Sequence, residues 1–109
     1  MASNYIEEGK RNAITPAADV ISGQLVMVGD LACVALKNIA AGASGPAAVE
    51  GVFELAGKDN TLAINQGQKV YREEASGKLT NVATGNAYVG IAWATAALAA
   101  TVVRVKLNA

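Results

Sequence analysis

The chain has 109 residues, no histidine, and nine basic and nine acidic side chains that give a formal net charge of zero. This length fits one domain with a sizeable core, and the neutral balance argues against a general nucleic-acid binder, which carries a basic excess. The lack of histidine excludes a Ser-His-Asp triad and a Cys-His pair. Hydrophobic residues make up 52% of the sequence but aromatic residues only 5%, so we expect a core of alanine and branched aliphatic side chains.

Residues 1–109 are predicted to form a single β domain, with residues 1–10 as an extended N-terminal arm. The arm is polar except for Tyr5 and Ile6. It lacks the apolar centre of a signal peptide, and no stretch of the chain has the length of apolar residues that a membrane-spanning helix needs. We therefore expect a soluble protein made in the cytoplasm, with no membrane partner.

Short strands separated by turn residues follow the arm. Residues 11–15 are predicted to form a strand that Pro16 ends, because a residue before proline favours extended geometry. The segments Leu25–Val28 and 31–36 are two further apolar runs on either side of a Gly29-Asp30 turn. Runs of this length with glycine between them indicate a hairpin.

The stretch 47–55 alternates between apolar and polar side chains, with Phe53 and Leu55 on one face and Glu50 and Glu54 on the other. Such alternation is typical of a half-buried strand. The stretch is therefore predicted to form one continuous strand, and residues 101–107 show the same alternation.

The second half of the chain repeats the pattern of the first half, which predicts an approximate internal duplication. The matched segments are 22–26 with 66–70, 33–36 with 90–93, the small-residue loop after Leu36 with 94–100, and 47–53 with 101–107. The second half carries an additional hairpin with a tight Ser76-Gly77 turn. Each half then reads as strand, strand, glycine- and alanine-rich loop, strand.

Residues 92–100 are the ambiguous segment, because their alanine content favours a helix. A helix of nine residues is marginal by itself, and the repeat favours a loop. With that loop, the chain holds about eight or nine short strands. The prediction is an all-β fold, either a compact β-barrel or a jelly-roll-like sandwich.

The sequence contains no catalytic, metal-binding or cofactor-binding constellation, so we do not expect an enzyme. Cys33 lies in an apolar run and is predicted to be a small buried hydrophobe. Glu50 and Glu54 would lie about 13 Å apart along one strand, too far to share a substrate bond. The segment 42–46 contains two glycines but no lysine after the second, so it is not a phosphate-binding loop.

The order of several short motifs resembles a family of small tailed-phage proteins, the capsid cement or head decoration proteins. The motifs are Asn4-Tyr-Ile-Glu-Glu-Gly-Lys10, Ser22-Gly-Gln24 with Val28-Gly29, Val34-Ala-Leu36, Val49-Glu-Gly-Val-Phe-Glu-Leu55, Gly67-Gln-Lys-Val-Tyr71, Ala83-Thr-Gly-Asn86 with Gly90-Ile-Ala92, and Val103-Arg-Val-Lys-Leu107. The chain departs from the family pattern at Trp93 and in the alanine-rich loop 94–100. Some members carry an older recombinase-like label, which the missing phosphate loop does not support here.

The resemblance implies a β-rich structural protein that sits on the outside of an icosahedral phage head. Its implied partner is a major capsid protein, and it would also contact other copies of itself, as a dimer or trimer. It would be synthesised in the cytoplasm of the host bacterium and act on the capsid exterior of the virion. The family offers no active site to carry over.

Interfaces tend to place aromatic side chains and arginine at their centre. The residues that we expect to make capsid or self-association contacts are Tyr5, Ile6, Arg11, Tyr71, Arg72 and Trp93. Packing within the monomer is the alternative role for each of these six residues.

A single-stranded nucleic-acid-binding barrel is the alternative function. Such proteins combine a basic groove with stacking aromatic side chains, and the sequence offers Lys69, Lys78 and Tyr88 besides the aromatic residues above. Glu73 and Glu74 interrupt this set and the chain is neutral, so nucleic acid is the less favoured partner.

Overall fold

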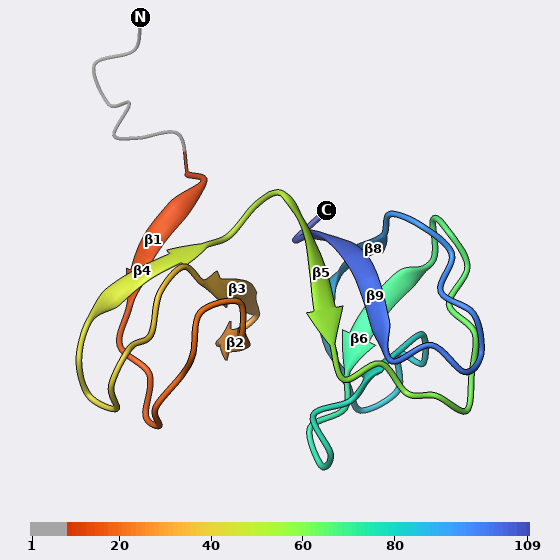
Figure 1. Ribbon diagram of the computed structural model, residues 1–109, viewed down its shortest axis with the longest axis horizontal. Coiled ribbons are helices and arrows are strands. Elements are labelled where there is room, and N and C mark those ends of the chain that lie inside the picture. Colours follow the sequence, from red (N-terminus) through yellow and green to blue (C-terminus); the bar gives the residue numbers. More distant parts are fainter. Residues whose placement is uncertain (1–8) are drawn as a thin grey trace, which may run out of the picture.

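The computed structural model describes residues 9–109, which form nine strands and no helix. The four-stranded antiparallel sheet has the order β1 (Arg11–Ile14), β4 (Gly45–Ala48), β3 (Leu31–Ala35), β2 (Leu25–Val28). The five-stranded antiparallel sheet has the order β5 (Val52–Ala56), β9 (Val102–Leu107), β8 (Ala87–Ala92), β6 (Lys69–Arg72), β7 (Leu79–Thr80). The two sheets lie side by side, joined by the segment between β4 and β5 (Figure 1). The all-β prediction is confirmed, and the open strand orders fit the sandwich rather than a closed barrel.

The internal duplication is visible in the strand order and in the pairing register. The order β1-β4-β3-β2 matches β5-β9-β8-β6, with β7 as the addition of the second half. Ala35 pairs with Ala47 in the first half, and Ala92 pairs with Val105 at the equivalent place in the second. The isolated bridge between Val20 and Ile39 likewise has its counterpart between Ile64 and Ala96. Both halves are therefore copies of one four-stranded unit.

A repeated turn explains the matching Ser-Gly-Gln and Gln-Gly-Gln motifs. Gly23 and Gly67 have φ angles of 87° and 88°, a region that glycine occupies without a steric penalty. Their N–H groups donate to the Ala35 and Ala92 carbonyls at 2.8 and 2.9 Å. In each turn the glutamine side chain closes the loop, since Gln68 Oε1 accepts from the Asn65 N–H at 2.8 Å. The glycine and the glutamine are thus both required by local geometry.

The stretch 47–55 is not one strand, so that prediction was wrong. β4 ends at Ala48 and β5 begins at Val52, and the two strands belong to different sheets. The chain turns at Gly51, whose φ is 110°. The alternation of apolar and polar residues in the sequence continues across the break, and this period alone does not show that the pairing partner changes. Residues 101–107 consequently match β4, not residues 47–53.

Ala92 ends β8 and residues 93–100 form a loop, as predicted from the repeat. The loop is fixed by paired backbone hydrogen bonds between Ala96 and Ile64 at 2.8 and 3.0 Å, and by a turn that closes from the Ala100 N–H to the Ala97 carbonyl at 3.0 Å. These tertiary bonds override the helix propensity of alanine, which is a weak preference over nine residues.

Each half has its own apolar core between its sheet and its loops. The first core contains Ile14, Val20, Cys33, Ala35, Ile39 and Ala47. The equivalent positions of the second half, Leu55, Ile64, Ala92, Ala96 and Val105, lie in the larger core. Strand β3 contributes to both, since Cys33 and Ala35 face the first core while Ala32 and Val34 face the second. This buried strand packs the two halves against each other.

At one pair of equivalent positions, the large and the small side chain are reversed between the two cores. In the first half Ile39 packs on Gly45, where an added Cβ would lie 2.5 Å from the isoleucine Cγ1. The equivalent residues of the second half are Ala96 and Val103, both buried. Glycine faces isoleucine in one half and valine faces alanine in the other, so the filled volume is kept.

Asn108 joins the two halves directly after β9. Its Oδ1 accepts a hydrogen bond from the Ala32 N–H at 3.0 Å, and its Nδ2 donates to the carbonyls of Ala32 at 2.8 Å and Val49 at 2.7 Å. Its own N–H donates to the Val89 carbonyl at 2.9 Å. Its φ is 54°, in the left-handed region that asparagine tolerates better than most residues. The side chain of Asn108 therefore satisfies backbone groups on two segments, and its backbone N–H bonds a third.

Replacing Asn108 tests this junction. We expect Asn108→Ala to lower the free energy of unfolding by about 2–4 kcal/mol, because backbone groups of Ala32 and Val49 lose their partners and alanine disfavours the left-handed region. Asn108→Gly should lose about 1 kcal/mol less stability than Asn108→Ala. Glycine loses the same side-chain hydrogen bonds but adopts the left-handed backbone conformation without strain. Urea unfolding followed by circular dichroism measures both. The exposed Asn60→Ala variant is the control, and a loss in Asn108→Ala no larger than in this control would contradict the assignment.

The exchanged core pair is tested by a double-mutant cycle. Gly45→Val should destabilise the protein by about 1–3 kcal/mol through overpacking against Ile39, and Ile39→Ala by about 2–5 kcal/mol through a cavity. Together they recreate the valine and alanine of the second half, so we expect a combined loss about 1 kcal/mol or more below the sum of the single losses. Gly45→Val combined with Ile64→Ala, in the other core, should be additive. Additivity in both pairs would refute the equivalence.

Candidate binding surface

The outward side of the five-stranded sheet carries an exposed mixture of apolar and charged side chains. Along β9 the side chains of Val103, Val105 and Leu107 are buried, so the intervening residues point outward. The register aligns β5 and β8 residues with them. We call this surface the tryptophan face, and it consists of Val52, Glu54, Ile91, Trp93, Val102, Arg104 and Lys106.

Trp93 is the largest exposed side chain of this surface. It directly follows β8, and its N–H donates to the Arg104 carbonyl at 2.8 Å. Its side chain is 53% exposed, with the Lys106 ammonium 5.9 Å from the ring centroid. A cation at that position contributes about 0.5–1 kcal/mol at an exposed site and restricts the indole. The backbone bond and the lysine together hold an exposed aromatic ring on a rigid sheet.

The charged pair on the tryptophan face adds little to its stability. Arg104 Nε and Glu54 Oε1 are 3.9 Å apart, and both side chains are more than half exposed. Exposed pairs of this kind contribute about 0–1 kcal/mol. Glu54 and Arg104 are thus available to a partner at small energetic loss.

A buried lysine fixes the loop beside the tryptophan face. Lys58 is 4% exposed, and its Nζ donates to the carbonyl oxygens of Asp59 at 2.8 Å, Leu98 at 3.2 Å and Ala100 at 3.3 Å, and also to that of Leu62. The ammonium thereby ties residues 58–62 to the loop 94–101. This loop borders a hollow of about 320 Å³ next to Glu54 and Arg104, and Leu98 at its tip is 57% exposed.

Sequence reasoning did not identify the role of Lys58. A lysine that follows a turn glycine normally lies in solvent, and no pattern in the sequence marks the four carbonyl groups that surround it. The neighbouring Asp59 stays ionised to lower pH than usual, because hydrogen bonds from the Thr61 hydroxyl at 2.6 Å and the Thr61 N–H at 2.9 Å lower its pKa. Lys78 and Lys58 lower the pKa of Asp59 further through their charge.

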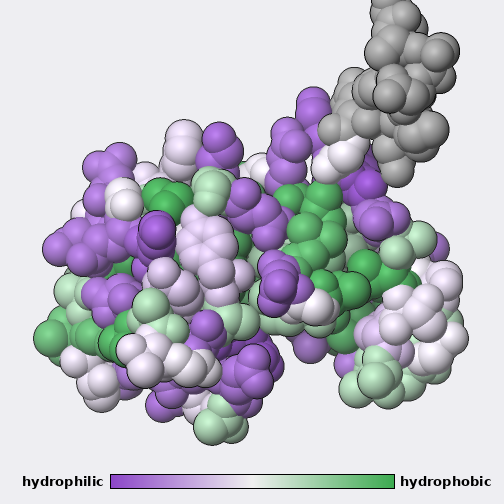
Figure 2. Space-filling model, turned by 180° about the vertical axis from the view of Figure 1, so that it is seen from behind, coloured by the Kyte–Doolittle hydropathy of each residue, from purple (hydrophilic) through white to green (hydrophobic). Residues whose placement is uncertain are grey.

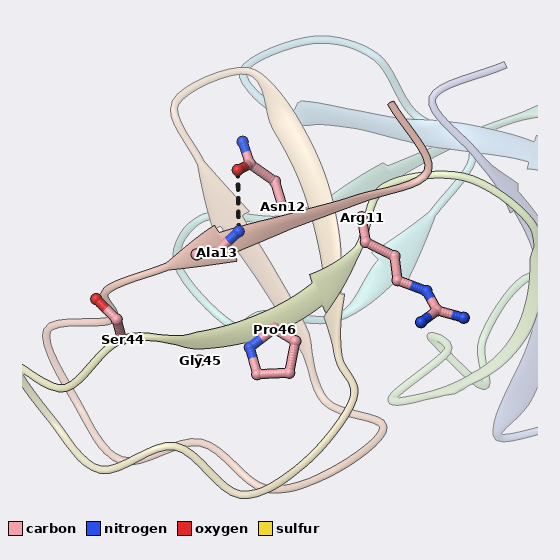
Figure 3. A pocket seen from close by; sticks show the side chains of 6 residues that line it. All are labelled: Arg11, Asn12, Ala13, Ser44, Gly45 and Pro46. Atoms are coloured by element: carbon pink, nitrogen blue, oxygen red, sulfur yellow. Dashed lines mark hydrogen bonds between the residues drawn. The ribbon is translucent and has the colours of Figure 1, made fainter. Parts of the chain in front are cut away.

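Two of the six predicted contact residues, Tyr5 and Ile6, lie outside the described residues. Arg11 is exposed on β1 and borders a shallow hollow of about 450 Å³ that is also lined by Asn12, Ala13, Ser44, Gly45 and Pro46. Figure 3 shows the Arg11 guanidinium extending away from Asn12 and Ser44, while Asn12 Oδ1 accepts from the Ala13 N–H at 2.9 Å. The arginine is thus free to reach toward a partner.

Tyr71 and Arg72 are half-buried at the end of β6. The Tyr71 ring packs edge-on against Tyr88, with centroids 5.6 Å apart, and the Tyr88 hydroxyl donates to the Ala109 carbonyl. Burial, and secondarily the neighbouring Tyr71, raises the pKa of Tyr88. Tyr71 therefore has a packing role inside the monomer, whereas Trp93 stays exposed. The structure brings Tyr71 and Arg72 together but not Arg11 or Trp93, so a contact role for each remains a prediction.

The described residues hold no group of three or more histidine, cysteine or acidic side chains that could ligate a metal ion. In residues 9–109 there is also no helix long and apolar enough to cross a membrane. Cys33 is fully buried, and burial raises the pKa of its thiol, which disfavours the reactive thiolate.

Replacing the buried lysine tests whether it fixes the loop. We expect Lys58→Met to lower the free energy of unfolding by about 2–4 kcal/mol, because four partly buried carbonyl groups lose a charged donor. Lys78→Met, at an exposed lysine of the adjacent hairpin, should change it by less than about 0.5 kcal/mol. Hydrogen exchange should show faster opening of the Ala96 and Ala100 amides only in Lys58→Met. Unchanged exchange there would contradict the assignment.

Comparisons with known proteins point to one family. The family model described as Phage cement protein matches residues 6–107 of the chain. No curated protein and no solved structure matches the chain. The matched region contains both copies of the repeated unit and the whole tryptophan face. With nearly its entire length matched, the chain belongs to the phage cement protein family.

Proposed function

We propose that this protein binds the outside of a phage capsid and stabilises the assembled shell. Membership of the cement family gives it a structural role in the phage and an association with the virion, in a family that is not enzymatic. The observation that carries the proposal is the exposed Trp93 on a rigid, hydrogen-bonded sheet, with Lys106 over its ring and with Val52 and Val102 exposed on the same face. An exposed aromatic ring with apolar neighbours is the usual centre of a protein interface.

The partner that we propose for the tryptophan face is the major capsid protein. The face is built on paired strands and held by Lys106 and by the loop that Lys58 fixes. Little conformational entropy is then lost when a partner docks on it. The neutral chain does not steer binding over long distances, so apolar contact should dominate the affinity.

Stabilisation of the shell would follow from mass action. A ligand that binds only the assembled lattice stabilises that lattice by its binding free energy. Many copies bound to one shell add their contributions, so weak individual contacts suffice. The N-terminal arm, residues 1–10 with Tyr5 and Ile6, is proposed as a second contact from the same single domain.

Trp93→Ala tests the proposal against a matched site in the other half. Leu36 occupies the equivalent position in the first half and is 37% exposed. We expect Trp93→Ala to weaken binding to phage heads that lack the protein by roughly 30-fold, the loss typical of a central aromatic contact of about 2 kcal/mol. Leu36→Ala should bind within about threefold of wild type. Co-sedimentation of heads with increasing protein measures both affinities.

Equal binding of Trp93→Ala and wild-type protein would refute a role for the tryptophan face. Absence of saturable binding by the wild-type protein would refute the function itself. A labelled single-stranded oligonucleotide at low salt is the parallel assay. Salt-sensitive oligonucleotide binding that is lost in Trp93→Ala would instead favour the nucleic-acid function.

A further inference from the structure

The four-stranded sheet ends at a strand that has no neighbour on its outer side. In the second half the equivalent strand β6 is covered by β7, where Tyr71 pairs with Thr80. The position of Tyr71 corresponds to Met27 on β2, when the two strands are aligned on their preceding Gly-Gln turns. β2 pairs only with β3 among the described residues. The first half thus leaves open the place that β7 fills in the second.

Two residues of β2 direct their backbone N–H and C=O groups toward the free edge of the sheet. Val28 pairs with Leu31 across the two-residue Gly29-Asp30 turn, and this closing pair of a hairpin exchanges hydrogen bonds. Bonding alternates along the strand, so Val26 also bonds to β3, while the N–H and C=O groups of Leu25 and Met27 point to the free edge. An unpaired edge of this kind is a template for another strand.

The β2 edge also lacks the charges that guard the other sheet edges. Residues 20–29 contain no charged side chain. In contrast, β1 carries Arg11, β5 carries Glu54, and β7 has only two residues beside Lys78. Charged side chains and short strands are the common ways to keep edges from pairing. Among the described sheet edges, β2 is therefore the one with neither a charged residue in the strand nor a length of only two residues.

Exposed apolar side chains surround this edge. Ile21 is 65% exposed, Val28 47% and Leu31 36%. A hollow of about 380 Å³ runs along β2 between Asp19 and Arg72. Figure 2 shows hydrophobic surface on the four-stranded half, next to its boundary with the other half. Exposed apolar side chains beside an unpaired edge favour its use as an interaction site.

We propose that β2 pairs with β2 of a second copy of this chain about a two-fold axis. In the antiparallel register centred on Val26, Leu25 of one copy exchanges hydrogen bonds with Met27 of the other, and the two sheets join into one. The second copy is the occupant that fits, because the strand is uncharged and apolar along its length and so opposes like side chains. The zero net charge of the chain gives no repulsion between copies.

This pairing goes beyond capsid binding and does not depend on it. A pair linked through the four-stranded halves leaves both tryptophan faces, on the five-stranded halves, available for the shell. Two linked sites bind a lattice more tightly than either one alone, provided that the geometry lets both engage. The β2 edge thus provides self-association while the tryptophan face provides capsid contact.

The test compares two exposed valines on two different sheet edges. Val28 on β2 and Val52 on β5 are 47% and 42% exposed. We expect Val28→Lys to raise the dimer dissociation constant about tenfold or more, since each pair then gains two charges on the paired edge, each of them opposite Gln24 of the other copy. Val52→Lys should change it by less than about twofold. Light scattering after size exclusion, over a series of concentrations up to about 1 mM, measures the constant, and thermal melting confirms that both variants fold.

Hydrogen exchange provides the second measurement. In the wild-type protein the amides of Leu25 and Met27 should become protected as concentration rises, while that of Val26, already bonded to β3, should not change. A protein that stays monomeric at the highest concentration, or equal weakening by both lysine variants, would overturn the proposal. If the monomer binds heads and Val28→Lys abolishes that binding, β2 pairs with a shell strand and the self-pairing is wrong. Loss of head binding only in Trp93→Ala concerns the proposed function and leaves this pairing intact.

Discussion

The amide of Asn108 is the constraint on which the arrangement of the two halves depends. It satisfies backbone groups of Ala32 and Val49 from the first half, while its own N–H is bonded within the second half. The larger core takes in only Ala32 and Val34 of the buried first-half residues, and side chains as small as alanine bury little apolar area. A directional, partly buried set of hydrogen bonds at the junction therefore orients the sheets where apolar contact alone would specify their relative position poorly.

Local sequence patterns predicted the strands and the duplication because each depends on neighbouring residues. The Gly23 and Gly67 turns, the Leu25–Val28 hairpin and the Ser76-Gly77 turn all follow from local geometry. The break between β4 and β5 was missed. Apolar and polar residues keep alternating in the sequence through Gly51, although the chain passes there from one sheet to the other. Pairing partners are long-range properties that period alone does not contain.

The candidate surface was only partly predictable for the same reason. Trp93 was chosen by its residue type, and its side chain is exposed, but its contact role stays a prediction. Its neighbours Lys106 and Val102 come from another strand, and only the pairing register brings them together with Val52. Lys58 was not identified at all, because the four carbonyl groups around it come from two separate loops. Backbone acceptors have no signature in a sequence.

The exchange of large and small side chains between the cores has a consequence for how a tandem protein folds. Two copies of one unit on one chain can trade strands, because their pairing registers are the same. A β4 placed in the second half would set Gly45 against Ala96 and leave a void, while a β9 placed in the first half would force Val103 onto Ile39. A void and a clash each destabilise by about 1–3 kcal/mol or more. Because the two halves differ at these positions, each strand packs well only in its own half. This difference helps the folding chain to place each strand in the correct sheet.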